Sequence, residues 1–147
     1  TTLANGGYYI ARFEASGTAS KITSKYNQTV LGNITQPNAA KVAREMYGEV
    51  KENNELVYAS DLVNSYAWDT AIIFIQTYST ETDASSYASQ NKSTSFANTG
   101  KSNDKYCNIF DMSGNAYEWT TEYSAKSVDS DFCPCVPRGG LRYSGWL

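Results

Sequence analysis

The chain has 147 residues, which is enough for one domain that buries its own hydrophobic core. Charged residues make up only 18% of it, the net charge is −3, and no basic patch is present, so nucleic acid is not an expected partner. The absence of histidine excludes Ser-His-Asp and Cys-His catalysis within the chain and removes the commonest zinc ligand.

Uncharged polar residues dominate the rest of the composition. Serine, threonine and asparagine together account for 43 of the 147 residues. Such a hydroxyl-rich, weakly charged surface is typical of extracellular and virion proteins, so an extracellular, bacterial-surface or virion location is expected. No apolar run is long enough to span a bilayer, so no membrane insertion is expected, and no signal-peptide pattern is visible.

The first third of the chain predicts a strand, a loop and a helix. Residues 7–14 are rich in aromatic and β-branched types, which predicts a strand after the Asn5-Gly6-Gly7 turn. Residues 15–35 are polar and contain glycines, which predicts a loop or a short hairpin. A helix is expected to begin at Thr35-Gln36-Pro37, to present one apolar stripe, and to end at Glu52-Asn53-Asn54.

A second helix is predicted from near Asp61 to Tyr78, because apolar residues recur along it with helical spacing. The segment 71–75 is apolar almost all round, so we expect it to be the most buried element of the chain. A β-strand is the alternative interpretation of this segment alone. Residues 79–106 predict one long loop, and a loop of that length in a compact domain is usually functional or held by other contacts.

The last third of the chain predicts strands. Residues 108–112 precede a turn at 113–115, and strands are expected at 117–123 and 136–143, the latter interrupted by Gly139-Gly140. Two helices followed by several strands predict an α+β fold, in which the two helices pack on small antiparallel sheets and long loops connect them. No internal repeat or linker is present, so the whole chain is interpreted as one domain.

Three cysteines allow at most one disulfide within the chain. Cys107 precedes one predicted strand and Cys135 begins another, so a bridge between neighbouring strands is geometrically plausible. The sequence does not decide whether Cys107 pairs with Cys133 or with Cys135, or whether all three thiols are reduced and buried. The Cys133-Pro-Cys135 spacing is too tight for the usual redox motif.

Four segments, taken together, resemble one protein family. They are 7–14 (GYYIARFE), Ala67-Trp68-Asp69, 108–120 (NIFDMSGNAYEWT) and Arg138-Gly139-Gly140. In this order and spacing they are similar to the formylglycine-generating-enzyme (sulfatase-modifying factor) family, whose fold is a variant of the C-type lectin fold. The third segment is the most specific, with Tyr117 where the family usually has tryptophan. The resemblance spans nearly the whole chain and implies a single C-type lectin-like domain.

The resemblance also implies a structural calcium ion. In this family the turn before the Glu-Trp pair holds calcium through backbone carbonyls and the glutamate side chain, and hard oxygen ligands of this kind suit Ca²⁺. The matching ligands are the carbonyls of Ser113, Gly114 and Ala116 and the side chain of Glu118. An ion pair between Glu118 and an arginine, such as Arg138 or Arg142, is the alternative.

The Arg-Gly-Gly segment and Asp69 both have interpretations that need no ligand. Two glycines in a strand permit a bulge or the close approach of another segment. Arg138 is then expected to anchor the strand by a forked interaction with a carboxylate. Asp69 lies in an apolar helix, so we expect it to face a polar edge or to cap a backbone group rather than to act as an acid or base.

The resemblance does not extend to the family's enzymatic chemistry. Those enzymes oxidise a cysteine of sulfatases to formylglycine with a cysteine pair downstream of the Arg-Gly-Gly segment. Residues 141–147 follow that segment here and contain no cysteine, so no catalytic residue is assigned and the chain is not expected to be an enzyme. Family members also continue to a closing Gly-Phe-Arg strand, so we expect the domain to lack its C-terminal closing segment. Sister subunits or a C-terminal partner segment would then cover the exposed sheet edge.

A ligand-binding role follows from the non-enzymatic branch of this family. That branch displays a binding surface at and beyond the Arg-Gly-Gly segment in phage receptor-binding proteins, bacterial surface proteins and the variable proteins of diversity-generating retroelements. The resemblance therefore implies a receptor-binding or adhesion domain whose partner is a protein or glycan on a cell surface. The matching ligand-binding residues are Arg142, Tyr143, Ser144 and Trp146, of types that make efficient contact surfaces.

Three alternatives remain open. Tyr143 and Trp146 are equally consistent with packing in the core. The chain is also consistent with a formylglycine-generating oxidase whose catalytic cysteines lie on a further C-terminal segment. A structural virion or surface domain is the third alternative, and a large apolar contact with sister subunits would mark it.

Overall fold

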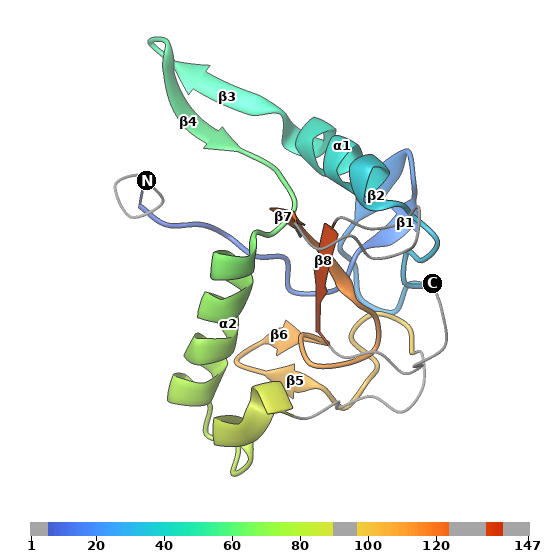
Figure 1. Cartoon of the computed structure of the whole chain (residues 1–147), viewed down its shortest axis with the longest axis vertical. Coiled ribbons are helices and arrows are strands. Elements are labelled where there is room, and N and C mark those ends of the chain that lie inside the picture. The colour runs from blue at the N-terminus through green and yellow to red at the C-terminus, as the bar shows by residue number, and fades with distance from the viewer. Residues whose placement is uncertain (1–5, 90–96, 124–134, 140–147) are drawn as a thin grey trace.

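The computed structural model describes residues 6–89, 97–123 and 135–139. This part of the chain forms two α-helices, one 3-10 helix and four two-stranded antiparallel sheets (Figure 1). The predicted α+β class is confirmed, because small antiparallel sheets accompany the helices and no parallel sheet alternates with them in the described residues. No helix in these ranges is both long enough and apolar enough to cross a membrane.

The N-terminal part contains one short hairpin rather than a long strand. Strand β1 (Ser16–Thr18) pairs with β2 (Lys21–Thr23), which is one of the two outcomes expected for residues 15–35. The predicted strand at 7–14 is wrong. Those residues run as an irregular segment, tied down at points such as the 3.1 Å hydrogen bond from the Phe110 N–H to the Arg12 carbonyl. Aromatic and β-branched residues favour an extended backbone, but a strand must also pair with a second strand. Residues 7–14 pair with no strand among the described residues.

Helix α1 (Gln36–Tyr47) begins as predicted and ends earlier than predicted. Thr35 precedes it in an extended conformation and Pro37 lies in its first turn. Gly48, with φ of 61°, ends the helix after Tyr47. The apolar stripe therefore stops short of Glu52, and the residues beyond Gly48 form a hairpin that the sequence interpretation missed.

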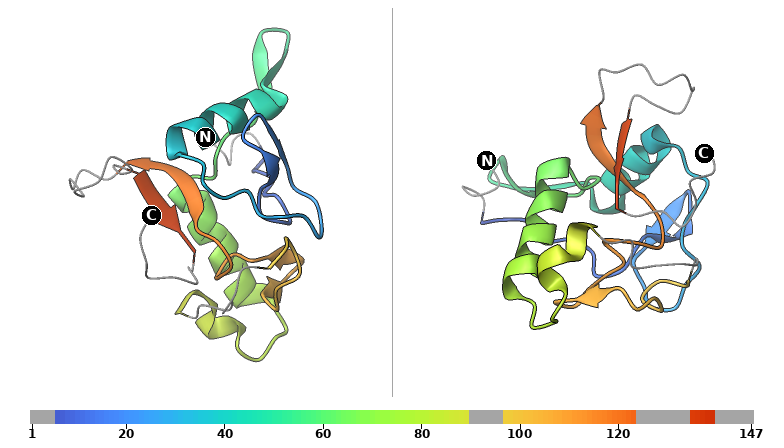
Figure 2. Two further views of the ribbon diagram at one scale, coloured as in Figure 1. Left: turned by 90° about the vertical axis from the view of Figure 1, so that its right-hand side faces the viewer. Right: turned by 60° about the horizontal axis from the view of Figure 1, so that its bottom comes forward.

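That hairpin consists of β3 (Glu49–Glu52) and β4 (Glu55–Ala59). Asn53 and Asn54 connect the strands with φ values of 52° and 65°, the left-handed pair that a tight two-residue hairpin turn requires. The hairpin extends away from the rest of the molecule (Figures 1 and 2). The two asparagines were therefore a turn signal rather than a helix end.

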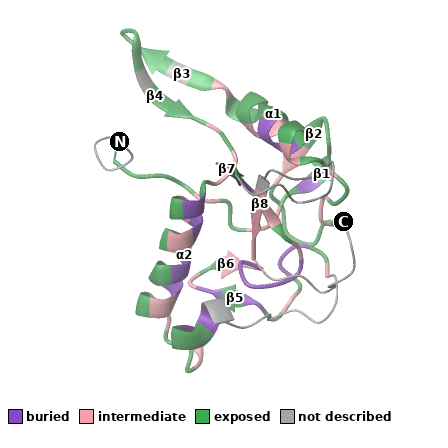
Figure 3. Cartoon of the chain, in the orientation of Figure 1, coloured by how far each residue is buried: buried purple, intermediate pink, exposed green. Residues whose placement is uncertain are grey.

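Helix α2 (Ser65–Tyr78) contributes four residues to the hydrophobic core. Asn64 caps it, because the asparagine Oδ1 accepts a 2.8 Å hydrogen bond from the Ala67 N–H. This cap explains why the helix begins at Ser65 and not near Asp61. The segment 71–75 is helical, but it is not buried all round: Ile73 is 60% exposed and Phe74 45% exposed. The opposite face of α2 is buried, as Figure 3 shows.

The hydrophobic core lies between α2 and the loop that follows it. Tyr87, in the 3-10 helix η1 (Ala84–Ser89), packs on Tyr106 of β5 (Lys105–Tyr106) with ring centroids 4.5 Å apart. Buried residues of α2 and Met112 complete this cluster. The predicted long loop 79–106 thus contains ordered elements that contribute to the core.

The remaining strands frame the turn on which the family resemblance depends. Strand β6 (Ile109–Phe110) pairs with β5, and β7 (Glu118–Tyr123) pairs with β8 (Cys135–Arg138). The strands predicted at 117–123 and, in its described part, at 136–143 are confirmed. The turn between β6 and β7 is the most thoroughly buried polar stretch of the described chain.

Candidate functional site

The turn between β6 and β7 is tied to the N-terminal segment by one glutamate. Oε1 of Glu14 accepts a hydrogen bond from the Ala116 N–H at 3.0 Å. Its Oε2 accepts one from the side-chain amide of Asn115 at 2.5 Å. Two of the segments that carry the family resemblance therefore meet in space, although about a hundred residues separate them.

Asn115 also joins this turn to residue 97. The asparagine is fully buried, its Oδ1 accepts from the Ala97 N–H at 2.8 Å, and its Nδ2 donates to the Ala97 carbonyl at 3.2 Å. Its φ of 69° is left-handed, a conformation that asparagine tolerates better than most residues. One side chain thus connects three segments of the chain.

Two fully buried aspartates hold the same turn. Asp104 accepts a 2.5 Å hydrogen bond from the Tyr87 hydroxyl and a 2.8 Å bond from the Ser113 N–H. Asp111 accepts a 3.1 Å hydrogen bond from the Gly100 N–H and another from a serine hydroxyl. These carboxylates satisfy backbone donors that would otherwise be buried without a partner, so they are part of the fold.

The acidic groups around this turn have raised pKa values, chiefly because they are buried. Burial, followed by the negative charge of Asp111, raises the pKa of Glu14 to about 8. Burial also raises the pKa of Asp111. Burial and then the neighbouring Asp104 raise the pKa of the Tyr87 hydroxyl. A cation placed among these groups would stabilise their charged forms.

Glu118 differs from the other acidic residues of the turn because one of its two carboxylate oxygens is buried without a hydrogen-bond partner. Its Oε2 is shielded from solvent and accepts no hydrogen bond, and the indole N–H of Trp68 is likewise buried and unpaired. Burial, followed by the charge of Glu14, raises the pKa of Glu118 well above its usual value. The nearby side chain of Trp68 acts in the opposite direction and lowers the pKa of Glu118 in part.

Gly139 allows β8 to approach the Glu118 carboxylate. Its φ of 84° is left-handed, and a Cβ atom added there would collide with the carboxylate and lie 3.4 Å from the Met112 carbonyl oxygen. The expected close approach at the Arg-Gly-Gly segment is confirmed for this glycine.

The residues of the turn fit a hard cation in one respect. The unpaired, shielded oxygen of Glu118 is the kind of ligand that Ca²⁺ coordinates. Among the described residues, no three acidic or cysteine side chains converge closely enough to hold a metal by side chains alone. A cation here would depend on one carboxylate and on backbone carbonyls of the turn.

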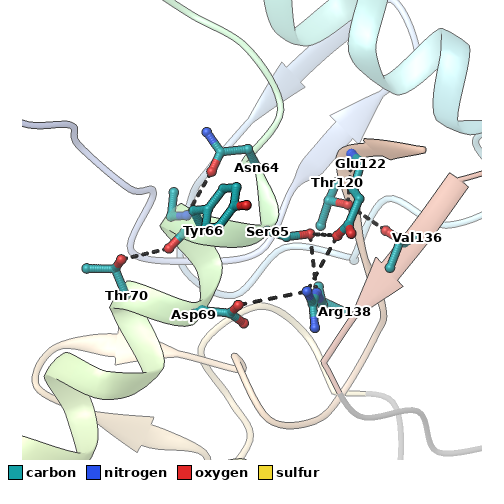
Figure 4. Close-up of polar contacts among 10 residues, drawn as sticks. Asn64, Ser65, Tyr66, Asp69, Thr70, Thr120, Glu122, Val136 and Arg138 are labelled. Atoms are coloured by element: carbon teal, nitrogen blue, oxygen red, sulfur yellow. Dashed lines mark hydrogen bonds and ion pairs between the residues drawn. The ribbon is translucent and has the colours of Figure 1, made fainter. Parts of the chain in front are cut away.

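Arg138 forms the second polar cluster, at the end of β8 (Figure 4). Its Nη2 lies 3.4 Å from Oε2 of Glu122 on β7 and 3.8 Å from Oδ2 of Asp69 on α2. Its Nε donates to the Ser65 hydroxyl at 3.4 Å, and that hydroxyl donates to Glu122. The guanidinium carbon lies 5.9 Å from the centroid of the Trp68 ring.

The Arg138 cluster joins α2 to both strands of the β7–β8 pair. The expectations that Arg138 anchors its strand to a carboxylate and that Asp69 faces a polar edge are confirmed. The expected fork is wrong, because a single nitrogen, Nη2, contacts one oxygen of Glu122 and one of Asp69 while Nε donates to Ser65. Glu118 is the Cα partner of Arg138 in the ladder. The arginine nevertheless pairs with Glu122 and Asp69, so the alternative pairing of Glu118 with Arg138 is wrong.

Several predicted site residues lie outside the described residues: Arg142, Tyr143, Ser144, Trp146, Cys133 and the side chain of Cys135. Strand β8 ends at Arg138, four residues before the first predicted ligand-binding position. Cys107 carries a free thiol, so the disulfide considered between Cys107 and Cys133 or Cys135 is not formed. Cys107 is half-buried and lines a small cleft of about 280 Å³ with Tyr78 and Lys105.

Sequence reasoning missed several residues of the two clusters, namely Glu14, Ser65, Asp104 and Glu122. Glu14 ends a segment that resembles the family, which is a signal that was available. Glu122 lies four residues after Glu118 on β7, and a regular strand puts two such residues on the same face, so its position near Arg138 was also open to prediction. Nothing in the sequence indicates that Ser65 or Asp104 contributes to these clusters.

Comparison with known proteins finds no family model, curated protein or solved structure that matches the chain.

Proposed function

We propose that this chain is a ligand-binding display domain with a C-type lectin-like fold of the formylglycine-generating-enzyme type. In this proposal it belongs to a phage or bacterial surface protein and binds a protein or glycan on a cell surface. The resemblance of four sequence segments suggests the class, and the mixed α+β architecture is compatible with it.

The observation that carries the proposal is the anchoring of Arg138. The Arg138 cluster fixes the end of β8 to α2 and β7, immediately before the segment that holds Arg142, Tyr143, Ser144 and Trp146. A binding segment that begins at a fixed point loses less conformational entropy when it binds, which favours affinity. The described residues therefore support a scaffold that presents the segment beyond β8.

Binding to whole cells and to a glycan array tests this proposal. The fluorescently labelled chain is screened against bacterial cells and arrayed glycans, and any hit is titrated with the triple variant R142A/Y143A/W146A. We expect the variant to lose at least about tenfold in affinity. The variant Tyr47→Ala is a matched control, because Tyr47 is 70% exposed at the far end of α1. Equal binding by the triple variant and the original chain would refute the site.

The same proposal includes a structural calcium ion at the turn. Ser113, Gly114 and Ala116 would supply carbonyls and Glu118 its carboxylate, and the ion would compensate the buried charge of Glu118. Calcium is expected to raise the melting temperature above its value in chelator. Glu118→Gln should abolish the increase and Glu122→Gln should retain it. An unchanged melting temperature for the original chain would reject the calcium site.

A further inference from the structure

One side of α2 carries an exposed apolar surface with no assigned role. Four of its residues are on the helix, with exposed fractions of 86% for Tyr66, 60% for Ile73, 45% for Phe74 and 68% for Tyr78. Tyr8, which is 43% exposed, extends the surface past the start of α2, since its hydroxyl donates to the Ala67 carbonyl at 2.7 Å. We call these five residues the α2 face. Figure 3 shows the exposed side of this helix at the edge of the molecule.

The α2 face is uncharged. Asp69 is the only charged residue of α2, and it lies at the border of the face, where it pairs with Arg138. The chain as a whole has a net charge of −3, so two copies repel one another weakly. The α2 face is a surface that a second copy can approach without placing like charges together.

The size of the face is near the lower limit of what a specific dimer needs. With about 200 Å² for a fully exposed aromatic residue, the exposed fractions of the four aromatic residues correspond to roughly 500 Å². Ile73 adds to this area. The smaller specific protein–protein interfaces bury about 600 Å² on each partner. An exposed apolar surface of this extent is as large as the largest patch of a typical monomer, and such a patch is often functional.

The pattern along the helix is close to symmetric. Tyr66 lies near one end of α2, Tyr78 at the other, and Ile73 and Phe74 near the middle. An antiparallel pairing of two such helices about a two-fold axis puts Tyr66 of one copy near Tyr78 of the other, with Ile73 close to its own counterpart. Such an isologous contact is the commonest interface of homodimers.

We propose that the α2 face binds the α2 face of a second copy of this chain, with the two helices antiparallel. This proposal is independent of the ligand-binding proposal, because it uses none of the residues of the Arg138 cluster or of segment 142–146. If both hold, the N-terminal ends of the two helices, and with them the two Arg138 clusters, lie at opposite ends of the helix pair. Two binding segments on one particle would increase avidity.

Sedimentation analysis across a concentration series tests the proposal. We expect the chain to dimerise reversibly and Ile73→Glu to raise the dimer dissociation constant at least about 30-fold, because two charges would be buried without partners. Val57→Glu is the matched control, since Val57 is 48% exposed on the hairpin away from the α2 face. A monomer at all concentrations, or a dimer that Ile73→Glu does not weaken, would overturn the proposal.

A cysteine cross-link tests the geometry with a substitution that does not add charge. Ile73→Cys is oxidised and the linked peptides are identified by mass spectrometry, so that the native cysteines do not confuse the result. We expect a disulfide between two copies of residue 73. The variant Val57→Cys should give no such link. A dimer that cross-links through position 57 but not through 73 would contradict the two-fold axis at α2.

Discussion

The two polar clusters of this domain differ in nearly every physical respect. The carboxylates around the β6–β7 turn are buried, and the hydrogen bonds that they accept from Ala116, Ser113 and Tyr87 are 2.5–3.0 Å long. The Arg138 cluster is partly exposed, with side-chain exposure of 32% for Arg138 and 49% for Asp69. The contacts of Arg138 with Ser65, Glu122 and Asp69 are 3.4–3.8 Å long.

This difference separates a buried part of the scaffold from a cluster that faces solvent. Buried hydrogen bonds to backbone donors are expensive to lose, because the donor cannot turn to water. Partly exposed ion pairs contribute little stability, since water solvates their members when they part. The turn therefore holds the fold together, whereas the Arg138 cluster orients the strand that leads to the proposed binding segment.

The largest effect is expected when Asn115 is removed. Asn115→Ala deletes hydrogen bonds to Glu14 and Ala97 and leaves their groups buried without partners. We expect a loss of about 2–4 kcal/mol in the free energy of unfolding, measured by urea denaturation. Asn98→Ala is the control, because Asn98 is exposed and donates only one 3.2 Å side-chain bond, to Asn27. Equal losses in the two variants would show that the buried hydrogen bonds of Asn115 contribute no more to stability than an exposed one.

The stability of the turn should also depend on pH. Burial raises the pKa of Glu14 from 4.5 to about 8, so the folded state holds this proton more tightly than the unfolded state. The contribution of Glu14 to the free energy of unfolding is therefore at its maximum below pH 4.5 and is lost as the pH rises through 8. In chelator, we expect the free energy of unfolding to fall by roughly 2 kcal/mol over this pH range. This loss is smaller than the limit that one titrating group allows, which is about 1.4 kcal/mol for each pH unit.

Glu14→Gln isolates this contribution, because glutamine does not titrate. Thermal unfolding in chelator at several pH values should show a flatter dependence for the variant than for the original chain. Glu45→Gln, an exposed substitution on α1, should leave the pH dependence unchanged. The same slope in Glu14→Gln as in the original chain would show that Glu14 is not the titrating group.

A smaller effect is expected at Gly139, where the two clusters meet. Gly139→Ala places a methyl group against the Glu118 carboxylate in a left-handed conformation, for a loss of about 1–2 kcal/mol. Gly32→Ala is the matched control, because a Cβ at Gly32 contacts nothing within 4 Å. Urea denaturation of both variants measures the difference. A neutral Gly139→Ala would mean that β8 does not approach Glu118 closely.

Local signals in the sequence predicted the elements that depend on them. The start of α1 at Thr35 and the β7 strand were confirmed, because proline placement and alternation act over a few residues. The predicted strand at 7–14 failed because strand pairing depends on a distant partner. The β3–β4 hairpin was missed because Asn53 and Asn54 were interpreted as a helix end rather than as a turn.

The site was predicted less completely for the same reason. Arg138 and Asp69 were identified individually, but their contact joins residues 69 positions apart. Glu14 and Asn115 meet across about a hundred residues, and neither residue type indicates the other. Composition and periodicity describe how one segment behaves, whereas these contacts depend on how several segments pack together.

The smallest effect on stability is expected at Asp69, which tests the comparison of the two clusters at the Arg138 cluster. Its carboxylate lies 3.8 Å from Arg138 and is 49% exposed, so water replaces the arginine when the pair is broken. Asp69→Asn should therefore change the free energy of unfolding by less than about 0.5 kcal/mol. If the Arg138 cluster serves to orient β8, the same variant should weaken ligand binding measurably, because Glu122 is then the one ionic partner of Arg138 among residues 6–89, 97–123 and 135–139. Urea denaturation beside a binding titration separates the two roles. A variant that loses stability and binding in proportion would show that the cluster belongs to the scaffold after all.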